Sequence, residues 1–136
     1  MVKKSSYEGL QENVRKFTTP EIEVWRNQYS DKDYLVRIET DEFTCICPKT
    51  GLPDFATIKV EYIPDKVCIE LKSLKLYFIS YRNIGIFHEH ATNRILDDLV
   101  KAARPRFMRL EMEYKSRGGV KTSTKAEYIR KGYRLK

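Results

Sequence analysis

The chain has 136 residues, enough for one domain with a buried core. Its 41% hydrophobic content and nine tyrosines exclude a disordered chain, and without a run of about 18 apolar residues we expect no membrane-spanning helix. The net charge of +7, from 26 basic and 19 acidic residues, favours an anionic partner without specifying nucleic acid.

Residues 1–30 are only weakly periodic, and we expect them to form an N-terminal arm of a single domain that covers residues 1–136. Polar residues rather than an apolar segment follow the start of the chain, so we expect no signal peptide there. Three cysteines, an odd number in a chain for which we expect no secretion, favour free thiols and a cytoplasmic location.

Two strands are predicted in the first half of the chain, at residues 34–40 and 58–62. The second is indicated by Ile58, Val60 and Tyr62, which alternate with charged residues. Between them, residues 47–54 contain two prolines and Gly51, which predicts a stiff loop and excludes a helix interior or a central strand. Extended structure resumes at residues 67–69.

A period of three to four residues then predicts two helices. Its apolar positions are Leu71, Leu74, Phe78 and Tyr81 in the first helix, and Ala91, Ile95, Leu99 and Ala102 in the second. The second helix begins near Glu89 and ends before Pro105.

The chain ends with a predicted hairpin: residues 108–114 alternate, residues 117–119 turn, and residues 120–128 return. Residues 129–136 form a basic tail. The order of elements indicates an α+β fold, with two helices on one face of a four-stranded antiparallel sheet. Because such a sheet has two open edges, we expect subunits to assemble into a ring or barrel.

The loop at residues 47–54 holds a thiol and a carboxylate. Lys49 beside Cys47 favours the thiolate, the nucleophilic form, and Asp54 is able to donate a proton to whatever the sulfur attacks. This pattern indicates covalent catalysis. The alternative is a polar turn with an incidental cysteine.

Two further segments carry candidate binding residues. Lys72 and Lys75 lie three residues apart near a helix start, which suits a phosphate group or, alternatively, an ordinary solvated helix face. Glu89 is able to accept two N–H donors from a guanine-like base, with His88 donating to its carbonyl oxygen. Alternatively, Glu89 only stabilises the helix N-terminus.

A zinc site is a third reading. Cys45, Cys47, His88 and His90 offer two thiols and two imidazoles. Their spacing is not that of a common structural zinc finger, so we expect no metal.

These motifs together resemble the NADPH-dependent 7-cyano-7-deazaguanine reductases of queuosine biosynthesis, of the short, single-module type. The matching segments are residues 43–56, 70–77, 87–89 and 117–119, and the resemblance runs from about residue 34 to residue 128. The stretch Glu-x-Lys-Ser-x-Lys-x-Tyr at residues 70–77 is the hallmark of the family. Cys45 departs from the pattern where a serine is expected, as does Leu71 relative to some members.

The resemblance implies the tunnelling fold, in which small α+β subunits close their sheets into a multimeric barrel with active sites between subunits. It also implies a four-electron reduction of a nitrile to a primary amine with NADPH as cofactor. Cys47 would form a thioimide with the nitrile carbon and Asp54 would protonate the nitrogen.

The resemblance likewise implies which residues bind the ligands. Glu89 and His88 would hold the deazaguanine ring, with contributions from Ile69, Glu70 and Leu71. Lys72, Lys75 and Arg117 would face the anionic cofactor. His90 and Cys45 receive no role.

Two other classes of function remain open from the residues alone. A zinc-dependent cyclohydrolase or pterin-type enzyme of the same fold would use the cysteines or histidines as ligands. A nucleic-acid-binding module would use the lysine face and the basic tail. The Cys47–Asp54 loop together with Glu89 favours the reductase, acting on a small molecule without binding nucleic acid or a membrane.

Overall fold

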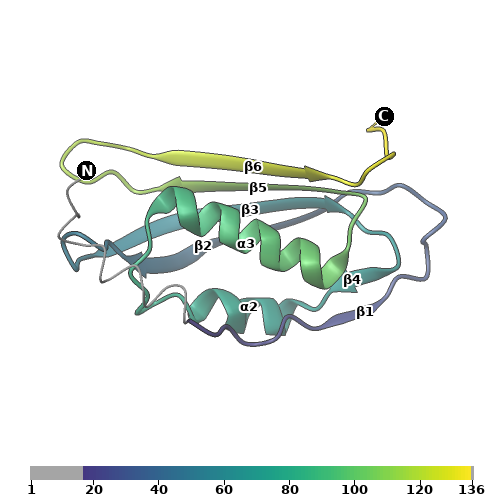
Figure 1. The fold of residues 1–136 in the computed structure, drawn as a ribbon, viewed down its shortest axis with the longest axis horizontal. Coiled ribbons are helices and arrows are strands. Elements are labelled where there is room, and N and C mark those ends of the chain that lie inside the picture. Colours follow the sequence, from purple (N-terminus) through teal and green to yellow (C-terminus); the bar gives the residue numbers. More distant parts are fainter. Residues whose placement is uncertain (1–16, 136) are drawn as a thin grey trace, which may run out of the picture.

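The structure, a computed structural model, describes residues 17–135. Figure 1 shows its elements in chain order. They are β1 (Val24–Arg26), β2 (Val36–Ile46), β3 (Pro53–Ile63), β4 (Val67–Ile69), α2 (Leu71–Ile79), α3 (His88–Ala103), β5 (Phe107–Tyr114) and β6 (Ser123–Ile129).

The main sheet is antiparallel with strand order β2-β3-β5-β6, and both helices lie on the same face of it (Figure 1). This confirms the predicted α+β fold. Every second residue of β3 from Asp54 to Tyr62 is buried, so the predicted alternation does mark the face that packs against the helices. No helix among residues 17–135 is long and apolar enough to cross a membrane.

A second, two-stranded sheet was not predicted. β1 pairs antiparallel with β4, with Trp25 opposite Cys68. β1 falls within the range expected to form an arm, of which residues 1–16 lie outside the described residues. The predicted basic tail, residues 129–136, begins inside the fold. Ile129 is the last residue of β6, and Arg130 Nη1 lies 2.6 Å from Asp65 Oδ2. Lys136 lies outside the described residues.

Strand β2 contains a bulge that changes which of its residues face the core. The register of the β2–β3 pair shifts between Thr40 and Phe43, and the two acidic residues between them are both exposed. After the shift Phe43 and Cys45 are buried. The bulge therefore turns the Cys45 side chain into the protein, just before the loop that holds Cys47.

Helix α2 begins with a carboxylate cap. Glu70 accepts hydrogen bonds from the backbone N–H groups of Lys72 (2.7 Å) and Ser73 (2.8 Å). The buried face of α2 differs in part from the predicted one: Leu74 and Phe78 are buried, Leu71 is 60% exposed, and Tyr81 lies beyond the helix end. The predicted apolar stripe therefore fails only at Leu71, since Tyr81 is buried although it follows the nine-residue helix.

Candidate active site

Cys47 lies in the tight turn that joins β2 to β3. Its N–H donates to the Leu52 carbonyl and its own carbonyl accepts from Gly51 N–H, both at 2.9 Å. Gly51 has a φ of 72°, in the left-handed region that favours glycine, so the turn depends on this residue. The thiol is left half-buried at the end of the sheet.

The turn favours the thiolate form of Cys47. Burial acts to raise the pKa of the Cys47 thiol, but hydrogen bonds from the Thr50 hydroxyl and from the backbone N–H groups of Thr50 and Lys49 outweigh it, so the pKa is lowered. Backbone N–H groups of the loop thus help to lower the pKa of the thiol, whereas the sequence indicated only an effect of the Lys49 ammonium. By contrast, burial and the nearby Asp54 raise the pKa of Cys45 to about 12.

Asp54 is the buried carboxylate of the site. The prediction that residues 47–54 contain no part of a central strand is wrong for Pro53 and Asp54, which begin β3. A proline is tolerated at the first residue of a strand. From β3, Asp54 places its Oδ2 3.0 Å from His88 Nε2 and its Oδ1 3.2 Å from Arg117 Nε.

His88 reaches Asp54 because the chain before α3 is bonded to the end of β2. Ile46 N–H donates to Ile84 O (2.9 Å) and Ile86 N–H donates to Ile46 O (3.0 Å). The imidazole stacks on the ring of the buried Tyr114, with centroids 3.5 Å apart and planes 5° from parallel. Glu89 follows in the first turn of α3 and is exposed.

The other predicted site residues lie at the opposite end of the sheet. Ile69 N–H donates to the Tyr62 hydroxyl (3.0 Å), and Tyr62 is eight residues from Asp54 along β3, about 26 Å at roughly 3.3 Å per residue. Glu70 and Leu71 follow Ile69, and with Trp25 these residues line a cavity of about 400 Å³. Within one chain, this group therefore lies far from Cys47, Asp54 and His88.

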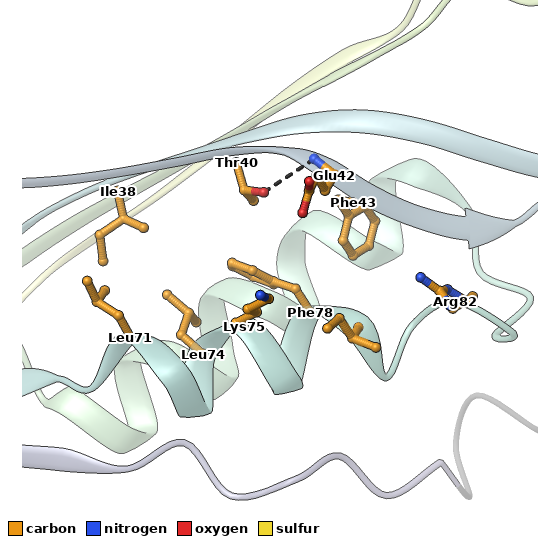
Figure 2. Close-up of a pocket in the computed structure, with 10 residues that line it drawn as sticks. Ile38, Thr40, Glu42, Phe43, Leu71, Leu74, Lys75, Phe78 and Arg82 are labelled. Carbon is orange, nitrogen blue, oxygen red and sulfur yellow. Dashed lines mark hydrogen bonds between the residues drawn. The ribbon is translucent and has the colours of Figure 1, made fainter.

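Of the three predicted cofactor cations, Arg117 lies with Asp54, whereas Lys72 and Lys75 lie on the exposed face of α2. A cavity of about 610 Å³ runs between β2 and α2, and Figure 2 shows the side chains that face each other across it. Lys75 lines this cavity together with Arg82, which follows the helix. Sequence reasoning missed Arg82, although its position directly after the predicted helix was a usable signal.

Two other contributors to the site were also missed. Thr50 and Tyr114 were read only as a turn residue and as a strand residue, and no local pattern marks their contacts with Cys47 and His88. Among the described residues no group of three or more His, Cys, Asp or Glu side chains is arranged to hold a metal ion.

The sequence is similar to a set of named enzymes. The profile of a family described as "QueF-like protein" matches residues 53–133. An NADPH-dependent 7-cyano-7-deazaguanine reductase of Nitrosococcus oceani is 56% identical over 83% of this chain and 88% of its own. The enzymes of the same name from Chlorobaculum tepidum and Chlorobium luteolum are 58% and 62% identical, over 79% and 73% of this chain and 92% and 85% of theirs.

This chain belongs to the family of NADPH-dependent 7-cyano-7-deazaguanine reductases. The resemblance drawn from the motifs is thereby confirmed. Among solved structures, the crystal structure of the archaeosine synthase QueF-Like in the apo form matches with a TM-score of 0.66 and 27% identity, over 71% of this chain and 94% of the other. The two helices on an antiparallel sheet are consistent with the tunnelling fold expected of the family.

Proposed function

We propose that this protein reduces the nitrile of 7-cyano-7-deazaguanine to the primary amine of 7-aminomethyl-7-deazaguanine, with NADPH as the source of four electrons, in the biosynthesis of queuosine. Family membership supports this activity. The observation that carries it is the buried Asp54 carboxylate, held between His88 and Arg117 at the end of the sheet where Cys47 has a lowered pKa.

The protein's own residues account for covalent and proton-transfer steps. The Cys47 sulfur forms a bond to the nitrile carbon, one carbon–nitrogen π bond breaks, and the nitrogen takes a proton from Asp54. The product is a thioimide. Once the thioimide carbon has received one hydride, the carbon–sulfur bond breaks, Cys47 leaves as the thiolate, and the resulting imine is reduced to the amine by the second hydride. NADPH, when bound, supplies a hydride for each of the two reductions.

The binding of the base is proposed to involve both ends of the sheet. His88 contacts Asp54 and is followed in α3 by Glu89, whereas Ile69, Glu70 and Leu71 line the distant cavity with Trp25. Because about 26 Å separates these groups in one chain, they would complete one site only across a contact between subunits. Within residues 17–135, strands β2 and β6 each leave one edge of the main sheet unpaired, which supports a homo-oligomeric barrel built by edge pairing.

Glu89 is expected to bind donor groups on the edge of the deazaguanine ring. Glu89→Ala should weaken substrate binding by about 1.5–3 kcal/mol, the usual contribution of a hydrogen bond to a charged group. The fold should be retained, because loss of a first-turn carboxylate costs a helix only about 0.3–1 kcal/mol. Calorimetry of substrate binding measures the change, with Asp97→Ala on the exposed face of α3 as the matched control. Unchanged affinity in folded Glu89→Ala would count against the assignment.

The cofactor is proposed to meet Lys72, Lys75 and Arg117, with Arg82 as a further candidate. The residues present fit an anionic group, because the two cations Lys75 and Arg82 outnumber the one carboxylate, Glu42, in a cavity whose walls are otherwise mostly apolar. Its size, about 610 Å³, lies within the range of about 300–1,000 Å³ of small-molecule sites.

If these cations hold the phosphates, the KM for NADPH should rise with ionic strength, since salt screens exposed charges over about 10 Å at 0.1 M. NADH, which lacks the 2′-phosphate, should be a much poorer reductant. Lys75→Gln and Lys72→Gln should each raise the KM for NADPH several-fold, while Lys101→Gln on the exposed face of α3 should not. Equal efficiency with both reductants and no salt effect would dismiss the phosphate-binding role.

The proposed function is tested by incubating the protein with 7-cyano-7-deazaguanine and NADPH while following NADPH absorbance. Two NADPH should be consumed for each amine formed, as required by a four-electron reduction. No consumption of NADPH by the folded protein would refute the proposal. The cytoplasmic location expected from the sequence stays a prediction.

A further inference from the structure

Arg117 makes a two-point contact with the start of β3. It follows β5 in the turn toward β6, and its Nε lies 3.2 Å from Asp54 Oδ1. Its Nη2 donates to the carbonyl oxygen of Pro53. One guanidinium thus contacts both the backbone of Pro53 and the side chain of Asp54. Because its nitrogens form a rigid planar group, this double contact limits rotation of the Asp54 side chain.

The two oxygens of Asp54 have partners from different elements. His88, at the start of α3, lies 3.0 Å from Oδ2, and Arg117 lies on the side of Oδ1. The Asp54 side chain is only 8% exposed and that of Arg117 is 42% exposed. Without Arg117, one oxygen of the buried carboxyl group loses its charged partner, and the group is held from one side only.

We propose that Arg117 is a positioning residue for Asp54, holding the carboxyl group in the orientation from which it gives its proton to the nitrile nitrogen. This inference rests on the proposed function. When the sulfur–carbon bond forms and the nitrogen takes the proton, Asp54 acquires a negative charge, and no electrons are exchanged with a redox partner. The guanidinium faces the carboxylate that this step creates, which stabilises the transition state more than the starting acid.

A positioning role and a cofactor-binding role act at different stages of the reaction. A cation that only holds NADPH has no effect in its absence, whereas a positioning residue acts during addition of Cys47 to the nitrile, before any hydride is needed. The rate of adduct formation from substrate alone, followed by intact-protein mass spectrometry at saturating substrate, therefore separates the two roles.

Arg117→Gln should slow adduct formation about 10- to 100-fold, because small misplacement of a catalytic group costs up to about 100-fold in rate. Its calorimetric affinity for substrate should stay close to that of the unmodified protein. Arg117→Lys should remain several-fold slow, since an ammonium lacks the fork that reaches both Pro53 and Asp54. Lys121→Gln, which removes one exposed charge from the same connection between β5 and β6, should react at the original rate.

Arg117→Gln reacting at the original rate without NADPH, with only its KM for NADPH raised, would overturn the inference. So would an original rate in Arg117→Lys, because charge alone would then suffice. Circular dichroism of both variants checks that they fold, as expected for a half-exposed residue in a turn. If the unmodified protein itself forms no adduct, the proposed function fails and the inference with it, an outcome distinct from a failure of the variants alone.

Discussion

Replacing Cys47 by alanine is expected to abolish both the covalent adduct and turnover. Substrate alone should add one nitrile mass per subunit to the unmodified protein, mapped by peptide mass spectrometry to Cys47. In Cys47→Ala the adduct should be absent and turnover should fall by roughly 10⁴-fold or more, the scale of loss when a covalent nucleophile is removed. The physical reason is that a nitrile carbon accepts hydride poorly until sulfur has added to it.

The other two thiols provide the controls. Cys45 is buried with a pKa raised to about 12, so it should stay protonated near neutral pH, and Cys68 is buried in β4 and should be inaccessible to the substrate. Cys68→Ala should keep adduct and turnover. An adduct on Cys45, or full activity in Cys47→Ala, would overturn the assignment.

The pH dependence of adduct formation tests how the turn acts on the thiol. Because the pKa of Cys47 is lowered, the thiolate is present below the ordinary thiol value of about 8.5, and the rate should rise with pH through a midpoint below that value. Thr50→Val removes a hydrogen-bond donor to the sulfur, so its midpoint should move to higher pH. An unchanged midpoint would show that Thr50 does not tune the thiol.

Asp54→Asn is the second change with a large expected effect. The amide is close in size to the carboxyl group, so the protein should fold, but it has no acidic proton to give. Turnover should fall by about 10²- to 10⁴-fold, the usual contribution of general acid catalysis, as measured by NADPH consumption at saturating substrate.

Asp97→Asn provides the matched control for Asp54→Asn. It makes the same chemical change on the exposed face of α3 and should leave turnover intact. Full turnover in folded Asp54→Asn would assign the proton donor to another group, with the neighbouring His88 the first to test.

The sequence predicted the long elements of the fold better than the short ones. Alternation in β3 and β5 and the three-to-four period of α3 extend over enough residues to identify each element. β1, at three residues, is too short to show a period and was missed, whereas the equally short β4 was predicted as extended structure at residues 67–69. The bulge in β2 was missed, although the consecutive charged residues Asp41 and Glu42 interrupt the alternation and were a usable signal.

The candidate site was predictable where its residues are close in sequence. Cys47 and Asp54 are only seven residues apart in the chain, and the motif at His88 and Glu89 was visible. The contact of Arg117 with Asp54 was missed because nothing local shows that β5 pairs with β3, the pairing that brings the turn at Arg117 to Asp54. For the same reason, the stacking of His88 on Tyr114 could not be predicted from the sequence.

The pairing of β3 with β5 bears on the order of folding. β2 with β3, and β5 with β6, form two hairpins from neighbouring segments, whereas the β3–β5 register joins Ile63 to Phe107 and Ala56 to Tyr114 across both helices. Local hairpins close quickly and non-local pairing is slow. The donors that activate Cys47 belong to the first hairpin, but the partners of Asp54 arrive with α3 and the second. A folding chain should therefore hold an activated thiol before the acid Asp54 is held by its partners, and nitrile addition should reach its full rate only once the central strands have joined.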